Sequence, residues 1–165
     1  MSCDSLDKLL TLEYQIAMIL FIIDRCNFRV GCEKYKDLYN SYGVTTLNSD
    51  HLVLNSNTVR IQFTGKKGVD NSALITNKYM VRLLKQLKTI NENREYLFTY
   101  RSTHNNQLCR VTEKHINNYL KKYHKIFLQY FSQLKKTLPL LVHDLYKLLF
   151  FYLFSKFYLD KNNLI

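Results

Sequence analysis

The stretch Val59-Arg60-Ile61-Gln62-Phe63-Thr64-Gly65-Lys66-Lys67-Gly68-Val69 decides the fold class. Its first half alternates apolar and polar residues, which is typical of a half-buried antiparallel strand. The Gly-Lys-Lys-Gly segment that follows is a turn signal. Residues 52–54 and 69–76 are further β-type runs on either side of the run at 58–64. The sequence therefore predicts a three-stranded antiparallel meander.

Helical patterns surround this predicted sheet. Residues 12–24 carry apolar side chains at helical spacing without Gly or Pro. We expect this helix to run out near Asn27, with Gly31 as a candidate stop. Residues 78–87 have an apolar stripe at helical spacing, with Lys and Arg on the other face. Thr112 is typical of an N-cap for a helix reaching about residue 123. The fold class is then α+β, a mostly helical domain with one small antiparallel sheet inserted between helices.

Two shorter segments complete the pattern. Residues 35–42 fit a short helix or a loop, and residues 96–98 a short extended piece. At 165 residues the chain has the length of a single domain, and we expect one domain over residues 1–165.

The charge balance indicates a nucleic-acid partner. There are 24 Lys and Arg residues against 13 Asp and Glu residues, which gives a formal net charge of +11. A small domain with this excess commonly neutralises phosphates. A Lys-rich codon bias that fills solvated positions is the alternative.

The cysteines and the apolar segments bear on location. None of the four cysteines forms a CxxC pair, so neither a metal site nor a disulfide framework is expected; they are Cys3, Cys26, Cys32 and Cys109. Residues 1–8 lack the apolar region of a signal peptide. Residues 138–154 are apolar but interrupted by Pro, His, Asp and Lys, which favours a buried helix over a membrane span. We expect an intracellular protein with no membrane partner.

Several motifs follow one another in a recognisable order. After the apolar helix come Phe-Arg-Val-Gly-Cys-Glu-Lys at 28–34, Tyr-Gly-Val-Thr-Thr-Leu at 42–47 and Phe-Thr-Gly-Lys-Lys-Gly-Val at 63–69. Tyr-Leu-Phe at 96–98 and Val-Thr at 111–112 follow. This order resembles the catalytic domain of type IB DNA topoisomerases, in the compact form of poxviruses, other large DNA viruses and bacteria. The resemblance covers about residues 12–123 and implies a fold like the core shared by these enzymes and tyrosine recombinases.

The resemblance also implies a reaction. In that family a tyrosine attacks a phosphodiester of duplex DNA, which forms a 3′-phosphotyrosyl link and releases a 5′-hydroxyl. The nicked strand swivels, supercoils relax, and the reverse step reseals the strand. The covalent link stores the bond energy, so the family needs no cofactor, neither ATP nor a metal ion. Protein cations then stabilise the five-coordinate phosphorus and protonate the leaving oxygen.

Two cations match the family's motifs. Arg29, in Arg-Val-Gly, matches the first catalytic arginine, whose planar fork can hold two non-bridging oxygens. Lys66 matches the lysine at a hairpin tip that acts as general acid, with Lys67 as the second choice. The alternatives are an Arg29 that caps the helix or pairs with Asp24 or Glu33, and an ordinary basic hairpin turn.

The last third departs from the family's pattern. The second catalytic arginine is expected in a Lys-x-x-Arg segment on the next helix, and the matching Lys125-Ile126-Phe127-Leu128 carries leucine instead. Tyr158, in Ser-Lys-Phe-Tyr-Leu-Asp, resembles the active-site tyrosine segment, with a tyrosine of a buried helix as the alternative. His143 is the candidate donor to a non-bridging oxygen, or a histidine without that role. His51 stands where the family often has a structural histidine.

A duplex lying against Arg29, Lys66 and residues 78–88 is the expected binding mode. Further DNA-binding candidates are the basic residues Arg60, Lys67, Lys78, Arg82 and Lys85. We expect the protein wherever DNA is, in a nucleus, a viral factory or virion, or a bacterial cytoplasm.

The departures leave three functions open: a topoisomerase, active or residual; a tyrosine recombinase, which should show His-x-x-Arg; and a DNA-binding remnant without the reaction. The family's N-terminal β-rich clamp is missing, and residues 128–158 are shorter than the matching region. A decayed gene, a split enzyme whose partner chain supplies the rest, and a frameshifted tail are the competing explanations.

Overall fold

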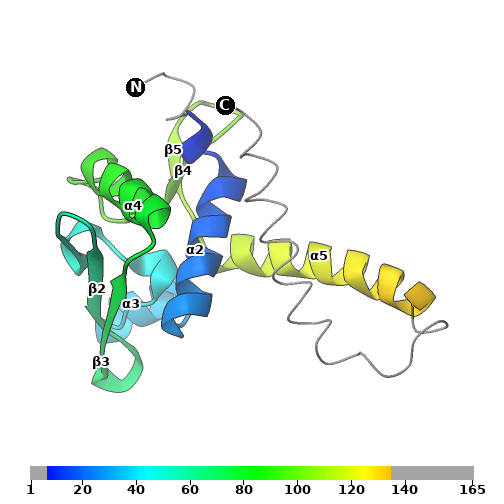
Figure 1. Cartoon of the computed structure of the whole chain (residues 1–165), viewed down its shortest axis with the longest axis horizontal. Coiled ribbons are helices and arrows are strands. Elements are labelled where there is room, and N and C mark those ends of the chain that lie inside the picture. The colour runs from blue at the N-terminus through cyan, green and yellow to red at the C-terminus, as the bar shows by residue number, and fades with distance from the viewer. Residues whose placement is uncertain (1–6, 135–165) are drawn as a thin grey trace. The chain divides into compact units, whose positions relative to one another are not determined.

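A computed structural model describes the backbone of residues 7–134 and the side chains of residues 7–123. The chain divides into two compact units, Met1–Ile116 and Asn117–Ile165. The first unit contains α2, α3 and α4 and two small sheets (Figure 1). The fold is therefore α+β, as the alternating and helical patterns predict.

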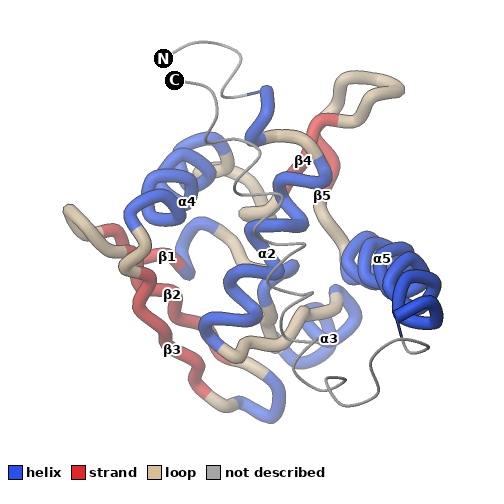
Figure 2. The backbone as a smooth tube through the Cα atoms, turned by 45° about the vertical axis from the view of Figure 1, so that its right-hand side comes forward, coloured by secondary structure: helices blue, strands red, loops and turns tan. Residues whose placement is uncertain are grey.

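The three-stranded sheet has the predicted meander topology. Strands β1 (Leu52–Leu54), β2 (Val59–Thr64) and β3 (Asp70–Ile75) pair antiparallel in the order β1-β2-β3 (Figure 2). Along β2 burial alternates as the sequence does, since its apolar side chains face the core and its polar ones face solvent. This alternation fixes the register, because a slip of one residue would expose the buried face.

Helix α2 (Leu12–Cys26) is the core helix. Its buried positions include Ile16, Ile19 and Ile22, and the last two are fully buried. The expected end near Asn27 is confirmed, and the proposed stop at Gly31 is wrong. The helix ends at Cys26, and Asn27 caps it in the left-handed conformation at φ 54°, which asparagine tolerates better than most residues.

Two shorter helices lie in the same unit. The segment expected to be a short helix or a loop forms α3 (Glu33–Tyr39), which has no buried residue. Helix α4 (Lys78–Ile90) buries one apolar stripe, as predicted, and Asn77 caps it by accepting a hydrogen bond from the amide of Met80. The Lys88 ammonium donates to the carbonyl of Leu52 at 2.7 Å, which ties α4 to the sheet.

A second hairpin was not predicted. Strands β4 (Thr99–Arg101) and β5 (Leu108–Arg110) pair antiparallel, so the strand begins just after the expected extended piece at 96–98. Buried Asn91 holds this region in place: its amide nitrogen donates to the carbonyl of Leu97 and its oxygen accepts from the Thr99 hydroxyl. These bonds satisfy a fully buried amide and join the end of α4 to β4.

Helix α5 (Glu113–Leu134) begins directly after Thr112, as predicted, but is longer than expected. No Gly or Pro interrupts residues 113–134, so nothing ends the helix near residue 123. Residues 125–128 therefore lie on the helix that starts after Thr112 and not on a following one. No helix within the described residues is long and apolar enough to cross a membrane. The apolar segment at 138–154 lies outside the described residues.

Candidate active site

Arg29 lies in the loop between α2 and α3, with its side chain exposed. Its carbonyl accepts a hydrogen bond from the amide of Val44 at 3.0 Å. The carbonyl of Val30 accepts from both the amide and the hydroxyl of Thr45, at 2.8 and 3.0 Å. Backbone hydrogen bonds thus join the loop to the Gly-Val-Thr-Thr segment. They fix the backbone of the loop, while the Arg29 guanidinium is exposed to solvent.

Two glycines make this pairing sterically possible. A Cβ on Gly31 would lie 2.9 Å from the Cα of Gly43, and a Cβ on Gly43 would lie 2.5 Å from the Cα of Gly31 and 2.8 Å from the carbonyl oxygen of Arg29. Gly31 also has φ +91°, which side chains rarely adopt. The Gly in each motif is therefore required by the close approach of two backbones beside Arg29.

Lys66 is exposed at the turn between β2 and β3, in the short helix η3 (Lys66–Gly68). The turn is closed by a 2.7 Å hydrogen bond from the amide of Gly65 to the carbonyl of Val69. Lys67 has φ 63° and Gly68 φ 73°. The Lys66 ammonium lies 5.6 Å from the ring centroid of Tyr35 on α3, so the hairpin end and α3 are neighbours (Figure 2).

The Arg29 loop and the Lys66 hairpin share one scaffold. Phe28, next to Arg29, packs edge-to-face on Phe63 of β2 with ring centroids 4.9 Å apart. The amide of Tyr42 donates to the carbonyl of Thr64, the last residue of β2, at 2.9 Å. One buried aromatic pair and one backbone bond therefore link the segments that carry the two cations.

The alternative ion pairs of Arg29 do not form. Asp24 lies 4.0 Å from Arg25, and Glu33 lies 2.7 Å from Arg110. Within residues 7–123, no carboxylate lies within 4.0 Å of the Arg29 guanidinium. Among these residues, none competes with an external anion for the side chain.

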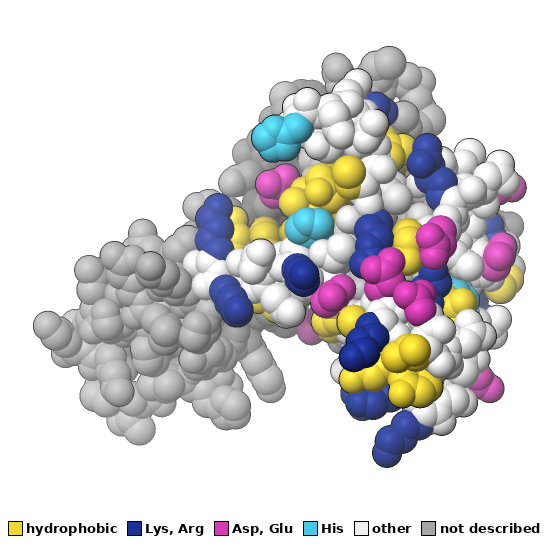
Figure 3. Space-filling model, turned by 180° about the vertical axis from the view of Figure 1, so that it is seen from behind, with side chains coloured by type: hydrophobic (Ala, Val, Ile, Leu, Met, Phe, Trp, Pro, Cys, Tyr) yellow, Lys and Arg dark blue, Asp and Glu magenta, His cyan; other side chains and the backbone are white. Residues whose placement is uncertain are grey.

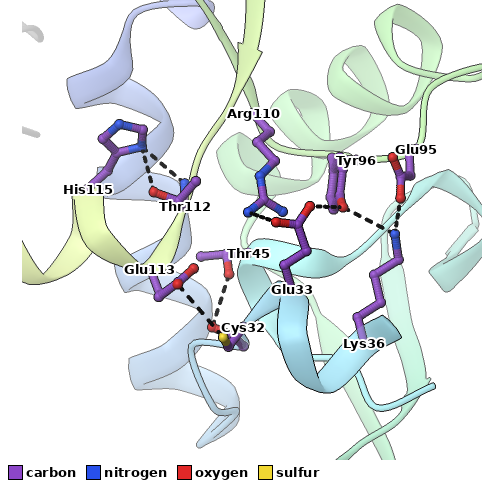
Figure 4. A network of polar contacts seen from close by, with 11 residues as sticks. Cys32, Glu33, Lys36, Thr45, Glu95, Tyr96, Arg110, Thr112, Glu113 and His115 are labelled. Atoms are coloured by element: carbon purple, nitrogen blue, oxygen red, sulfur yellow. Dashed lines mark hydrogen bonds and ion pairs between the residues drawn. The ribbon is translucent and has the colours of Figure 1, made fainter. Parts of the chain in front are cut away.

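A polar network joins α3 to the second hairpin and to α5 (Figure 4). The two oxygens of Glu33 accept from Arg110 at 2.7 Å and from the Tyr96 hydroxyl at 2.9 Å. The Cys32 thiol donates to the Glu113 carboxylate at 3.8 Å. Sequence reasoning did not find this network, because 77 residues separate Glu33 from Arg110 and no local pattern links them.

Lys36 extends this network. Its ammonium donates to Glu95 and, at 3.2 Å, to the Tyr96 hydroxyl. Partial burial lowers the pKa of Lys36, but the hydrogen bonds to Glu95 and Tyr96 outweigh that effect and leave the pKa raised. The same hydrogen bond lowers the pKa of Glu95. Lys36 therefore stays charged and bonded to Glu95 and Tyr96.

Two histidines within the described residues, His51 and His115, make structural bonds through their rings. The amide of Asn48 donates to Nδ1 of His51 at 3.0 Å, and the amide of Thr112 donates to Nδ1 of His115 at 3.1 Å. Burial lowers the pKa of His51; burial and then the charge of Arg110 lower that of His115. Both rings are neutral acceptors that fix a turn and the start of α5.

The predicted DNA-binding cations lie on three elements. Lys67 belongs to η3, Arg60 projects from the exposed side of β2, and the other three belong to α4. Arg82 lies over the ring of Tyr79, 5.2 Å from its centroid. Lys85 is used internally, since its ammonium donates to the carbonyl of Ser56 at 2.8 Å. Figure 3 shows a face on which acidic, basic and hydrophobic side chains are interspersed, so the basic charge is not uniform there.

Several predicted residues cannot be placed. Tyr158 and His143 lie outside the described residues, and so do the side chains of Lys125 and Leu128. Between residues 7 and 123, no group of three or more His, Cys, Asp or Glu side chains is arranged to hold a metal ion.

Comparison with known proteins decides the family. Residues 3–128 match the family described as eukaryotic DNA topoisomerase I, catalytic core. The chain belongs to this family. The matched range contains the Arg29 loop, the Lys66 hairpin and the whole polar network. It also contains residues 125–128, and the sequence has no arginine after Arg110.

A viral member of the topoisomerase family is similar to this chain. The DNA topoisomerase 1B of Acanthamoeba polyphaga mimivirus is 29% identical over 110 residues, which is 65% of this chain and 32% of the relative. The chain thus spans about a third of the length of that topoisomerase. The family assignment confirms the resemblance carried by the motifs at 28–34, 42–47 and 63–69.

Proposed function

We propose that this chain carries the catalytic chemistry of a type IB topoisomerase on duplex DNA. The observation that carries the proposal is the pairing of the Arg29 loop with Gly43–Thr45, which fixes the backbone while no described carboxylate neutralises the guanidinium. An uncompensated guanidinium on a fixed loop, with an exposed lysine on the hairpin that packs against the same segment, suits a phosphodiester that gains negative charge during the reaction.

Each residue has a role in the proposed reaction. Tyr158 loses its phenolic proton to solvent and attacks the phosphorus, a 3′-phosphotyrosyl bond forms, and the bond to the 5′-oxygen breaks. Lys66 gives its proton to that departing oxygen, and Arg29 holds the non-bridging oxygens, with His143 as a further donor. The 5′-hydroxyl returns in the reverse step and releases Tyr158, so the strand is resealed without a cofactor.

Duplex DNA is the proposed partner, and the protein acts wherever that DNA is, in a nucleus, a viral factory or virion, or a bacterial cytoplasm. The cations Lys67, Arg60, Lys78 and Arg82 contact phosphates beside the reacting one. Lys85 is the weakest of these candidates because its ammonium already bonds a carbonyl of this chain. A partner chain that supplies the family's N-terminal clamp or further active-site residues is part of the proposal.

A second function is favoured by one observation. No arginine follows Arg110, so neither the Lys125–Leu128 segment nor any other part of α5 supplies a second guanidinium. Loss of one charge-stabilising donor typically costs about 10²–10³ in rate. A DNA-binding remnant of a topoisomerase, without turnover, is therefore the alternative. A tyrosine recombinase is less favoured, since the matched family is that of topoisomerases.

Relaxation of negatively supercoiled plasmid in EDTA tests the proposal. The purified chain should relax the plasmid, and Tyr158→Phe should not. Relaxation by both proteins would keep the reaction and move the nucleophile to another tyrosine. A chain that shifts the plasmid in a gel but never relaxes it would establish the remnant.

A further inference from the structure

Within residues 7–123 no carboxylate pairs with Arg29, although an acidic residue is close to it in the sequence. Glu33 follows four residues later, at the start of α3, directly after the loop that holds Arg29. A carboxylate there would attract a free guanidinium and repel an incoming phosphate. The negative charge of Glu33 therefore has to be neutralised by another residue if Arg29 is to bind DNA.

Both oxygens of Glu33 are already occupied. Arg110 donates to one at 2.7 Å, and the Tyr96 hydroxyl donates to the other at 2.9 Å (Figure 4). The Arg110 guanidinium also lies 4.9 Å from the ring centroid of Tyr96, which fixes its direction. Tyr96 is 8% exposed, so the pair rests on a buried ring.

We infer that Arg110 is a positioning residue that neutralises Glu33 and thereby leaves Arg29 free for a DNA phosphate. Arg110 acts through Glu33 on Arg29 and does not itself touch the reacting atoms. The inference deepens the proposed function and rests on it, because it takes the Arg29 ligand to be a phosphate of duplex DNA.

A shielding role and a purely structural role of Arg110 predict different results when Glu33 is removed as well. If Arg110 only braced β5 against α3, removing Glu33 as well would leave the fold equally or more damaged. If Arg110 shields Arg29 from Glu33, removing both charges restores a free Arg29. The double substitution thus separates the two roles, since the neutral Gln isostere keeps an acceptor for Tyr96.

Equilibrium binding of a fluorescein-labelled 20-base-pair duplex to the full chain, followed by anisotropy at about 0.1 M salt, is the test. Arg110→Met should weaken binding by about three- to tenfold, the range for one partly exposed charge. Arg110→Met with Glu33→Gln should bind within about twofold of the unmodified protein, and Glu33→Gln alone at least as tightly. In an Arg29→Met background, Arg110→Met should change the affinity by less than about twofold.

Matched controls use the same network. Glu95→Gln removes the neighbouring exposed ion pair with Lys36 and should not weaken binding. Arg110→Lys keeps the charge and should bind like the unmodified protein, and Arg110→Gln replaces Arg110→Met if the apolar side chain prevents folding. Circular dichroism confirms that each variant is folded.

Three results would overturn the inference: no loss on neutralising Arg110, a loss that Glu33→Gln fails to restore, or a loss that persists undiminished without Arg29. Plasmid relaxation is read separately. A chain that binds the duplex but never relaxes plasmid refutes the proposed reaction. The affinities of the Arg110 and Glu33 variants then still test whether Arg110 shields Arg29 from Glu33.

Discussion

Gly43→Ala should disable the site while leaving the fold largely intact. A methyl group at residue 43 would lie 2.5 Å from both the Cα and the amide nitrogen of Gly31, and 2.8 Å from the carbonyl oxygen of Arg29. All three are backbone atoms, so no side chain can rotate away. Gly43 itself has an extended backbone with φ −153°, so the substitution adds no conformational strain of its own.

The size of the effect follows from these distances. Non-bonded carbon atoms prefer separations of about 3.5–4.0 Å, so the Arg29 loop must move by about 1 Å. Overpacking of this kind costs about 1–3 kcal/mol of unfolding free energy. A displacement of about 1 Å in a group that must meet the transition state costs about 100-fold in rate. Catalysis should therefore suffer far more than stability.

The assay is the single-turnover formation of a covalent adduct on a nicked suicide duplex, together with the melting temperature. Gly43→Ala should slow adduct formation by about 100-fold and lower the melting temperature by a few degrees. Ile75→Val, which removes one buried methylene from the far end of β3, is the control of similar stability. Equal rates for the two variants would refute the reasoning.

Three further outcomes follow. Lys66→Ala should leave duplex affinity within about threefold and slow cleavage much more, and an equal loss of both would refute its role as general acid. Lowering the pH from 7.5 to 5.5 should lower the urea midpoint, because burial depresses the pKa of His51 in the folded state, so that below about 6.5 the unfolded state binds a proton more readily than the folded state does. His51→Gln should flatten this dependence, and an unchanged slope would contradict it. Lys78→Ala should reduce the salt dependence of duplex binding by about 0.9 in log–log slope, whereas Lys85→Ala should mainly lower stability, since Lys85 bonds the β1–β2 turn. The same slope change in both variants would argue against this division.

Much of the fold could be predicted because its signals are local. Alternation from Val59 to Phe63 and the Gly-Lys-Lys-Gly turn are enough to specify a hairpin, and the structure pairs β2 with β3 within a residue of the predicted bounds. The long apolar stripe of α2 is equally local. The second hairpin was missed because β4 and β5 are three residues each, too short for a period to show.

The site was only partly predictable, for a related reason. The motifs around Arg29 and Lys66 identify the two cations, but the bonds that hold Arg29 join it to a segment 15 residues away. The Glu33–Arg110 pair joins residues on different elements, and no rule of spacing reports it. Hydrophobic patterns in the sequence predict which face of a single helix or strand is buried. This site depends instead on which helices and strands contact one another, and such patterns do not encode that.

Transfer of DNA to the protein tests the central claim most directly. The chain is incubated in EDTA with a duplex whose scissile strand carries a 5′-phosphate label, and the reaction is stopped with denaturant. A labelled protein band that disappears in Tyr158→Phe and falls by at least about 100-fold in Arg29→Ala is the predicted result. A chain that binds this duplex but never acquires the label would contradict the account, and the fold would then serve DNA binding alone.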